Sequence, residues 1–125
     1  MTEKKVLLAI DDNVQQLSEF KSMLSGKYDL RLVKSAAEAL RFLNNETADL
    51  ILLDIEMPNI SGFTFLDDIK AIPVYFDVPI IIISGNSGCE FSEKVSKSKA
   101  AASLTKPVKQ DILIDTIEKY LASKN

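Results

Sequence analysis

Five short aliphatic runs, separated by stretches with helical periodicity, constrain the fold of this chain more than any other sequence feature. The runs are residues 6–10, 30–33, 50–53, 80–83 and a weaker fifth run at 103–105. Runs of this length and character are typical of strands that are buried on both faces of a parallel sheet. Parallel neighbours need right-handed crossovers, so the sequence predicts a doubly wound α/β fold with five parallel strands in five βα units, (βα)5.

Between the runs, apolar residues recur at the spacing of an amphipathic helix. The four clear stripes are Leu17, Phe20 and Leu24; Ala36, Leu40 and Leu43 behind a capping Ser35; Phe63, Leu66 and Ile69; and Leu113, Ile117 and Leu121 behind Pro107. The stretch 87–99 is rich in Ser and Lys and offers only Phe91 and Val95 as apolar anchors. We therefore expect the fourth helix to be short or mobile.

The size and charge of the chain limit the classes of function that it can have. With 125 residues and 46% hydrophobic content, residues 1–125 are expected to form a single domain. The 18 acidic and 15 basic residues are spread along the chain, which argues against direct binding of nucleic acid or of an anionic membrane. Cys89 has no second cysteine to pair with, and residues 6–10 are too short for a signal peptide or membrane span, so a cytoplasmic setting is expected.

Polar residues follow four of the five runs, at the points where the strands are expected to end. The carboxyl ends of parallel strands lie at one edge of the sheet, where such folds bind ligands. The chain contains no histidine, so any chemistry at this edge depends on carboxylates, lysines and hydroxyls. The residues in question are Asp11 and Asp12, Asp54, Ser84 and Gly85, and Lys106 and Pro107.

Each of these residues by itself fits a helix cap, a turn or a solvated side chain, and only their coincidence at one edge suggests a site. Carboxylates brought together repel one another unless a cation lies among them, and Mg²⁺ prefers oxygen ligands while leaving positions for phosphate oxygens. Lys106 beside such a metal indicates that a further anion binds there. Ser84 offers a hydroxyl donor, and Gly85 allows close approach of a bulky group. The set points to phosphoryl transfer, with a carboxylate as nucleophile.

The order and spacing of these motifs resemble those of the response-regulator receiver domain, in its single-domain, chemotaxis-regulator-like form. The resemblance covers essentially the whole chain and implies a flavodoxin-like sheet with strand order 2-1-3-4-5 and a cis peptide bond before Pro107. The motifs that carry it are Ile10-Asp11-Asp12-Asn13, Leu53-Asp54-Ile55-Glu56-Met57-Pro58 with Gly62, Ser84-Gly85, and Leu104-Thr105-Lys106-Pro107.

The resemblance also implies a role for each site residue. Asp54 accepts the phosphoryl group, Ser84 is the switch hydroxyl and Lys106 pairs with the phosphoryl group. The implied Mg²⁺ ligands are Asp11, Asp12, Asp54 and the main-chain carbonyl of Glu56. The donor is a phosphohistidine on a sensor histidine kinase or a histidine phosphotransfer protein, and the signal passes to an unknown downstream protein. Such a domain is no enzyme toward other substrates and catalyses only its own Mg²⁺-dependent phosphorylation and dephosphorylation.

Two positions depart from the family pattern. Ser103 stands where the family usually has the aromatic residue that follows the switch hydroxyl inward, and Lys99 stands where a glycine often ends the fourth helix. A lysine in a left-handed helix cap carries a steric cost. The phosphorylation site is thus complete in sequence, while the usual output route is expected to be weakened or rerouted.

Two alternatives come from other functional classes. A hydrolase of the haloacid-dehalogenase type also uses an aspartyl phosphate and Mg²⁺, but it needs a second acid two residues after its nucleophile, and the residue two after Asp11 is Asn13. A phosphorylation-independent interaction module with a vestigial acidic site is the other. In this chain every acid and the lysine are present, and phosphorylation of Asp54 is the observation that separates the alternatives.

Overall fold

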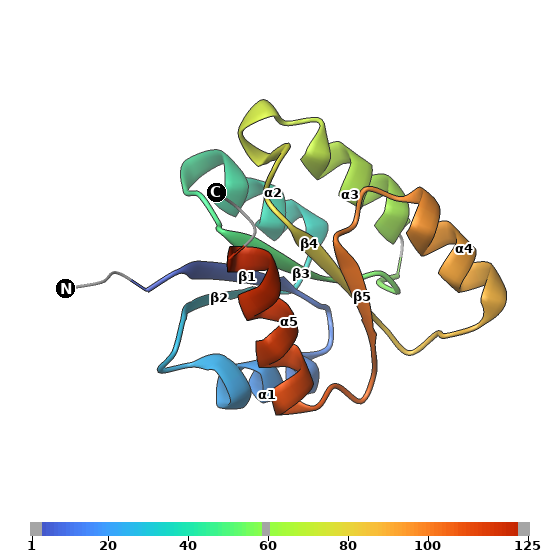
Figure 1. The fold of residues 1–125 in the computed structure, drawn as a ribbon. Helices are drawn as coiled ribbons and strands as arrows, with labels where there is room; N and C mark the ends of the chain where they lie inside the picture. The colour runs from blue at the N-terminus through green and yellow to red at the C-terminus, as the bar shows by residue number, and fades with distance from the viewer. Residues whose placement is uncertain (1–3, 59–60, 123–125) are drawn as a thin grey trace.

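A five-stranded parallel sheet forms the centre of the computed structural model, which describes residues 4–58 and 61–122 (Figure 1). The strand order is β2-β1-β3-β4-β5, which confirms the predicted topology. The structure extends four of the predicted runs by one residue, two at their start and two at their end, so that Asp54 and Ser84 are the last residues of their strands. The strands are β1 (Val6–Ile10), β2 (Asp29–Val33), β3 (Leu50–Asp54), β4 (Ile80–Ser84) and β5 (Ala102–Thr105).

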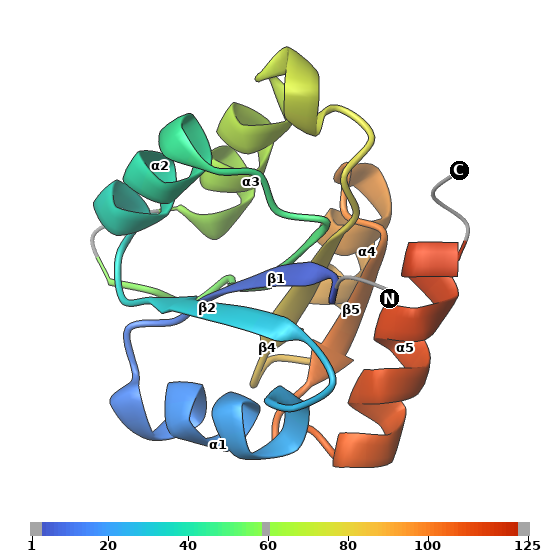
Figure 2. The ribbon, with the colours of Figure 1, turned by 90° about the vertical axis from the view of Figure 1, so that its left-hand side faces the viewer.

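Helices cover both faces of this sheet. Helices α1 and α5 lie on one face, and α2, α3 and α4 lie on the other (Figures 1 and 2). A short 3-10 helix, η1, was not predicted; Pro73 is its first residue, a position that needs no N–H donor. The helices are α1 (Val14–Leu24), α2 (Ala36–Asn45), α3 (Gly62–Lys70), η1 (Pro73–Tyr75), α4 (Cys89–Lys97) and α5 (Gln110–Ala122).

Alternate side chains of the sheet fill two separate cores. Leu8 and Leu53 belong to the core under α2 and α3, whereas Leu7 and Leu52 belong to the core under α1 and α5. Every residue of β3 and β4 is buried, because these strands lie in the middle of the sheet and are covered on both faces. The residues that end β3 and β4 are therefore held by strands that are buried along their whole length.

Polar side chains begin three of the helices. The Ser35 hydroxyl accepts a hydrogen bond from the Glu38 N–H at 3.1 Å, as predicted for the start of α2. Asn13 caps α1 by accepting from the Gln16 N–H at 3.1 Å. The capping role that Asp11 and Asp12 could have filled thus belongs to Asn13, which leaves both carboxylates for the site.

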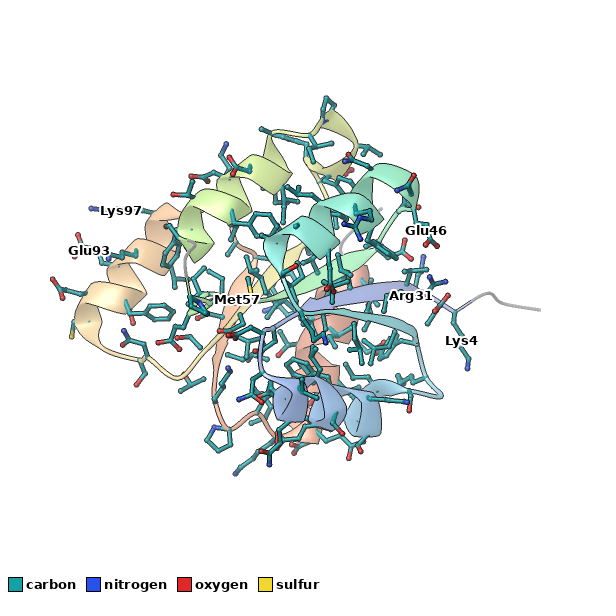
Figure 3. All side chains as sticks on the ribbon, turned by 180° about the vertical axis from the view of Figure 1, so that it is seen from behind. Lys4, Arg31, Glu46, Met57, Glu93 and Lys97 are labelled. Carbon is teal, nitrogen blue, oxygen red and sulfur yellow. The ribbon has the colours of Figure 1, made fainter. Side chains whose placement is uncertain are left out.

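Helix α4 is held to the rest of the molecule by few side chains. It has nine residues, as many as α3 and fewer than α1, α2 and α5, so it is one of the two shortest α-helices among the described residues, as expected. None of its residues is fully buried, although Phe91 and Val95 pack partly against the core, and the ring of Phe91 lies 6.0 Å from that of Phe63. On its exposed side, Lys97 Nζ pairs with Glu93 Oε1 at 3.0 Å (Figure 3).

The end of α4 differs from the expectation of a left-handed cap at Lys99. The cap residue is Ser98, whose backbone is extended, with φ −85° and ψ 174°. Its hydroxyl donates to the Val95 carbonyl at 2.7 Å and accepts from the Ala100 N–H at 3.2 Å. The serine side chain therefore satisfies the end of the helix, and Lys99 is not the cap.

Within the described ranges, none of the helices has the length and apolar character that a membrane crossing requires.

Candidate functional site

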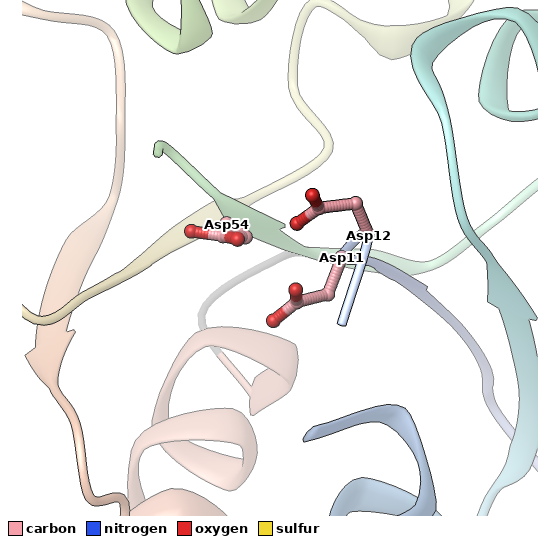
Figure 4. Close-up of side chains that lie close together, drawn as sticks. All are labelled: Asp11, Asp12 and Asp54. Atoms are coloured by element: carbon pink, nitrogen blue, oxygen red, sulfur yellow. The ribbon is translucent and has the colours of Figure 1, made fainter. Parts of the chain in front are cut away.

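Two carboxylates end neighbouring strands at the centre of the sheet. Asp11 follows β1 directly, Asp54 is the last residue of β3, and the two strands pair in register from Leu7 opposite Leu50 to Ile10 opposite Leu53. Asp11 is 0% exposed and Asp54 is 4% exposed, whereas Asp12 faces solvent. Figure 4 shows that the three side chains lie close together.

The three carboxylates and one lysine form a compact charged cluster. One oxygen from each of Asp11, Asp12 and Asp54 lies within 4.8 Å of the other two. Lys106 Nζ lies 3.4 Å from Asp11 Oδ2 and 3.7 Å from Asp54 Oδ2. Four of the residues that sequence analysis placed at this edge are thus together in space, contributed by the ends of three different strands.

Main-chain N–H groups hold the two buried carboxylates in place. Asn13 N–H donates to Asp11 Oδ1 at 2.9 Å, and Glu56 N–H donates to Asp54 Oδ1 at 3.0 Å. Each bond closes a tight turn within two residues of the acid, so the rotamer of the carboxylate is tied to its own loop. The second oxygen of each acid faces Lys106 and is available to a ligand.

Burial raises the pKa of Asp54 to about 6, because the charged carboxylate loses solvent at the end of β3. The neighbouring Asp11 carboxylate acts in the same direction, while the Glu56 N–H and the Lys106 ammonium oppose the increase. The ionised form of Asp54 is therefore disfavoured in the protein alone. A cation among the carboxylates would favour it.

The donor set fits Mg²⁺. Three carboxylate oxygens converge from one side, and the exposure of Asp12 leaves the other side of the cluster open to water or phosphate oxygens. Within the described residues this is the group of acidic side chains that could hold an ion. The assignment of the Glu56 carbonyl as a further ligand stays a prediction.

The residues after β4 complete the rim of the site. Ser84 is 1% exposed, and its hydroxyl oxygen accepts from the Asn86 N–H at 2.9 Å. The next N–H, that of Gly85, donates to Glu56 Oε1 at 2.8 Å. The loop after β4 is thereby connected to the loop after β3 by the side chain of Glu56.

The other two predicted site residues have different positions. Pro107 follows Lys106 through a cis peptide bond, as the family resemblance implies. Ser103 is exposed on β5 opposite Ile82 and contributes no side chain to the cluster. The expectation that serine in place of an aromatic residue at position 103 weakens or reroutes the switch therefore stays a prediction.

Sequence reasoning missed two functional contacts at this edge. Asn13 both caps α1 and orients Asp11 through its N–H, and the Asp-Asp-Asn order before a helical stripe is a signal that could have identified the cap. The contact of the Glu56 side chain with Gly85 joins loops 29 residues apart and has no local sequence signal.

The site geometry agrees with what comparison with known proteins finds. The sequence model of the family described as "Response regulator receiver domain" matches residues 7–118. The chain is 30% identical over 122 residues to the 3',5'-cyclic-nucleotide phosphodiesterase regA of Dictyostelium discoideum. This alignment covers 95% of the present chain but only 15% of that protein. It is 31% identical to the transcriptional regulatory protein ZraR of Escherichia coli K12, over 93% of this chain and 26% of ZraR.

Relatives and structures of similar length also match. The polar-differentiation response regulator DivK of Brucella ovis is 25% identical, with 94% of this chain and 96% of DivK covered. The crystal structure of a CheY-like receiver domain protein from Methanospirillum hungatei superposes with a TM-score of 0.86 at 28% identity, over 98% of this chain and 97% of that one. The chain therefore belongs to the response regulator receiver domain family, the signalling modules of two-component systems.

Proposed function

We propose that this receiver domain takes a phosphoryl group from a phosphohistidine onto Asp54, with Mg²⁺ bound beside it, and signals by binding another protein. The observation that carries the proposal is the buried Asp54 carboxylate within reach of Asp11, Asp12 and the Lys106 ammonium. The donor is a sensor histidine kinase or a histidine phosphotransfer protein, because this chain has no histidine of its own. A cytoplasmic location belongs to the same proposal and rests on the sequence.

In the proposed step, a carboxylate oxygen of Asp54 attacks the phosphorus and the bond from phosphorus to the donor imidazole nitrogen breaks. The electron pair stays on that nitrogen, and Asp54 becomes an acyl phosphate. Bound Mg²⁺ would supply neutralisation of the charge on the phosphoryl oxygens. Lys106 adds a positive charge at the same place, the Glu56 N–H keeps the carboxylate oriented, and Ser84 can turn its hydroxyl from its own loop to a phosphoryl oxygen.

The proposed activity is limited to the domain's own phosphorylation and dephosphorylation. The phosphodiesterase among the relatives is matched over 15% of its length, so its activity gives no reason to propose a phosphodiesterase here. The alternative, an interaction module with a vestigial site, predicts that Asp54 stays unmodified. The intact cluster and the lysine favour phosphorylation over this alternative.

Incubation with acetyl phosphate and Mg²⁺ is expected to add one phosphoryl group to Asp54, because in-line transfer needs only a positioned carboxylate and a neutralising cation. Intact mass spectrometry measures the adduct in the native chain and in Asp54→Ala, which should remain unmodified. Asp68→Ala, which removes an exposed acid on α3, is the matched control and should be modified like the native chain. An adduct that persists in Asp54→Ala, or no adduct on the native chain, would contradict the proposal.

A further inference from the structure

The Glu56 carboxylate accepts a hydrogen bond from a main-chain N–H at the rim of the site. Its Oε1 accepts from the Gly85 N–H at 2.8 Å, and Gly85 directly follows Ser84 at the end of β4. Strand β4 pairs with β3 so that Ile83 lies opposite Asp54. The Gly85 N–H is therefore positioned two residues beyond the residue that faces the phosphoacceptor.

This N–H is accessible to an anion other than Glu56. Gly85 is exposed, and a Cβ built on it meets only Glu56 Oε1, at 3.6 Å. A backbone N–H that donates to a carboxylate oxygen can donate equally to a phosphoryl oxygen, since both are anionic acceptors. One N–H cannot serve both at full strength, so the two anions compete for it.

We propose that the Glu56 side chain is an internal competitor of the phosphoryl group for the Gly85 N–H, and that on displacement it pairs with Lys94 on α4. The inference rests on the proposed function, because it assigns the regulation of the same site. Phosphorylation then exchanges one contact of Glu56 for another. Such a difference between states is what allows a ligand to shift a conformational equilibrium.

Lys94 is the suitable second partner because it borders the same hollow. A cavity of about 220 Å³ is lined by Glu56, Asn86, Phe91 and Lys94, among others. None of the ion pairs among the described residues involves Lys94, whereas Lys97, one turn away, already pairs with Glu93. The displaced carboxylate thus has an unengaged cation next to it. Its pairing would connect the loop after β3 to a helix that has no buried residue.

This device would replace part of what the missing aromatic residue does elsewhere in the family. Ser103 is exposed and offers no large side chain that could differ between two states. An exchange at Glu56 acts on α4 directly, and α4 is the helix with the weakest attachment to the core. The predicted consequence is ordering of residues 89–97 when the phosphoryl group binds.

Removal of the Glu56 side chain changes the affinity for a phosphoryl mimic in opposite directions under two explanations of its contact with Gly85. If the contact only holds the loop in a binding-competent shape, removal of the side chain weakens binding of the phosphoryl mimic. If Glu56 competes for the N–H, its removal strengthens binding. Beryllofluoride with saturating Mg²⁺ serves as the mimic, and its affinity is followed by amide chemical shifts of the whole chain.

Glu56→Ala is expected to bind beryllofluoride about fivefold more tightly, the size expected for one charge-assisted hydrogen bond discounted for exposure. The variant also loses the pair with Lys94, but Lys94 is exposed, so solvent screens that pair and it offsets only part of the gain. Glu56→Gln keeps an oxygen acceptor without the charge and should fall between Glu56→Ala and the native chain. Separate titrations with Mg²⁺ test whether a change in metal affinity explains the result. Loss of a negative charge beside the metal lowers the affinity for Mg²⁺, so it cannot by itself raise the affinity for beryllofluoride. Equal or weaker binding by Glu56→Ala would overturn the inference.

The second arm tests the exchange to α4. Hydrogen exchange of residues 89–97 should slow on addition of the mimic in the native chain, and Lys94→Ala should remove most of that slowing. Lys97→Ala is the matched control on the same helix and should retain it, since Lys97 pairs with Glu93. Equal behaviour of the two lysine variants would overturn the pairing with Lys94. A native chain that binds no mimic at Asp54 refutes the proposed function itself, whereas normal binding that does not respond to Glu56 refutes only this inference.

Discussion

Asp12→Ala is expected to lower the affinity for Mg²⁺ by more than about 100-fold, which exceeds the usual effect of losing an outer-sphere partner of a metal. Asp12 supplies the exposed carboxylate of the cluster, and its oxygen lies within 4.8 Å of those from Asp11 and Asp54. Lys106→Ala should leave Mg²⁺ binding largely intact, because it removes a positive charge 3.4 Å from Asp11, but it should disturb the response to phosphorylation. Calorimetric titration of Mg²⁺ into both variants measures the difference, and equal losses would contradict the assigned roles.

Asp12→Ala is also expected to be more stable than the native chain in metal-free buffer, because it removes one of three carboxylates that repel one another. The gain in the free energy of unfolding should be only roughly 0.5 kcal/mol, because Asp12 is exposed and solvent screens its charge.

Mg²⁺ binding to the native chain should weaken as the pH falls through about 6, where Asp54 takes up a proton and stops being a ligand. Above that pH the acid is ionised and the affinity should level off. Titration at about pH 5 and about pH 7.5 checks this direction.

Gly62→Ala is expected to destabilise the domain by about 3 kcal/mol, equivalent to a fall of about 10 °C in Tm. A Cβ at Gly62 would lie 2.5 Å from the Ile55 carbonyl oxygen and 2.7 Å from Ile55 Cα, so backbone would have to move. Helix propensity alone predicts the opposite sign, because alanine is favoured over glycine inside a helix by about 1 kcal/mol. Thermal and urea unfolding of the purified variant measure the outcome.

Gly88→Ala provides the control for this effect. A Cβ at Gly88 meets only Asn86 Oδ1, at 3.7 Å, so the change costs no steric clash and only the weaker capping of α4, less than about 1 kcal/mol. Similar losses in the two variants would show that close packing of α3 against Ile55 is not the reason for glycine at position 62. A large loss restricted to Gly62→Ala would confirm that this glycine lets α3 begin against the loop that follows Asp54.

The strands could be predicted from the sequence because their pattern is local. Runs such as Leu50–Leu53 and Ile80–Ile83 are apolar at consecutive positions, and only a strand with cover on both faces buries such a run completely. The meeting of Asp11, Asp54 and Lys106 followed from the same pattern, since the carboxyl ends of parallel strands share one edge. Strand order itself came from the family resemblance, and the structure agrees with it.

The local sequence pattern was a weaker guide to the formation of α4 and to the contacts at its end, because both depend on residues outside the helix. The sequence of α4 is poor in apolar anchors, yet it forms nine helical residues, because Phe91 and Val95 find Phe63 and the core beneath them. Its end is satisfied by the Ser98 hydroxyl, which donates to the Val95 carbonyl, and the identity of residue 99 carries no signal of this contact. In both cases the deciding contacts lie outside the pattern used for the prediction.

The sequence by itself determined which residue types stand at the ends of the strands, and therefore the kind of chemistry that this domain can perform. Only the tertiary structure decided how exposed each carboxylate is, with Asp11 buried and Asp12 at the surface, and that Glu56 reaches the Gly85 N–H. The physical reason is that strand burial follows from apolar periodicity along a few residues. A contact between two loops depends instead on how the strands beneath them pair and on which rotamer the packing leaves open.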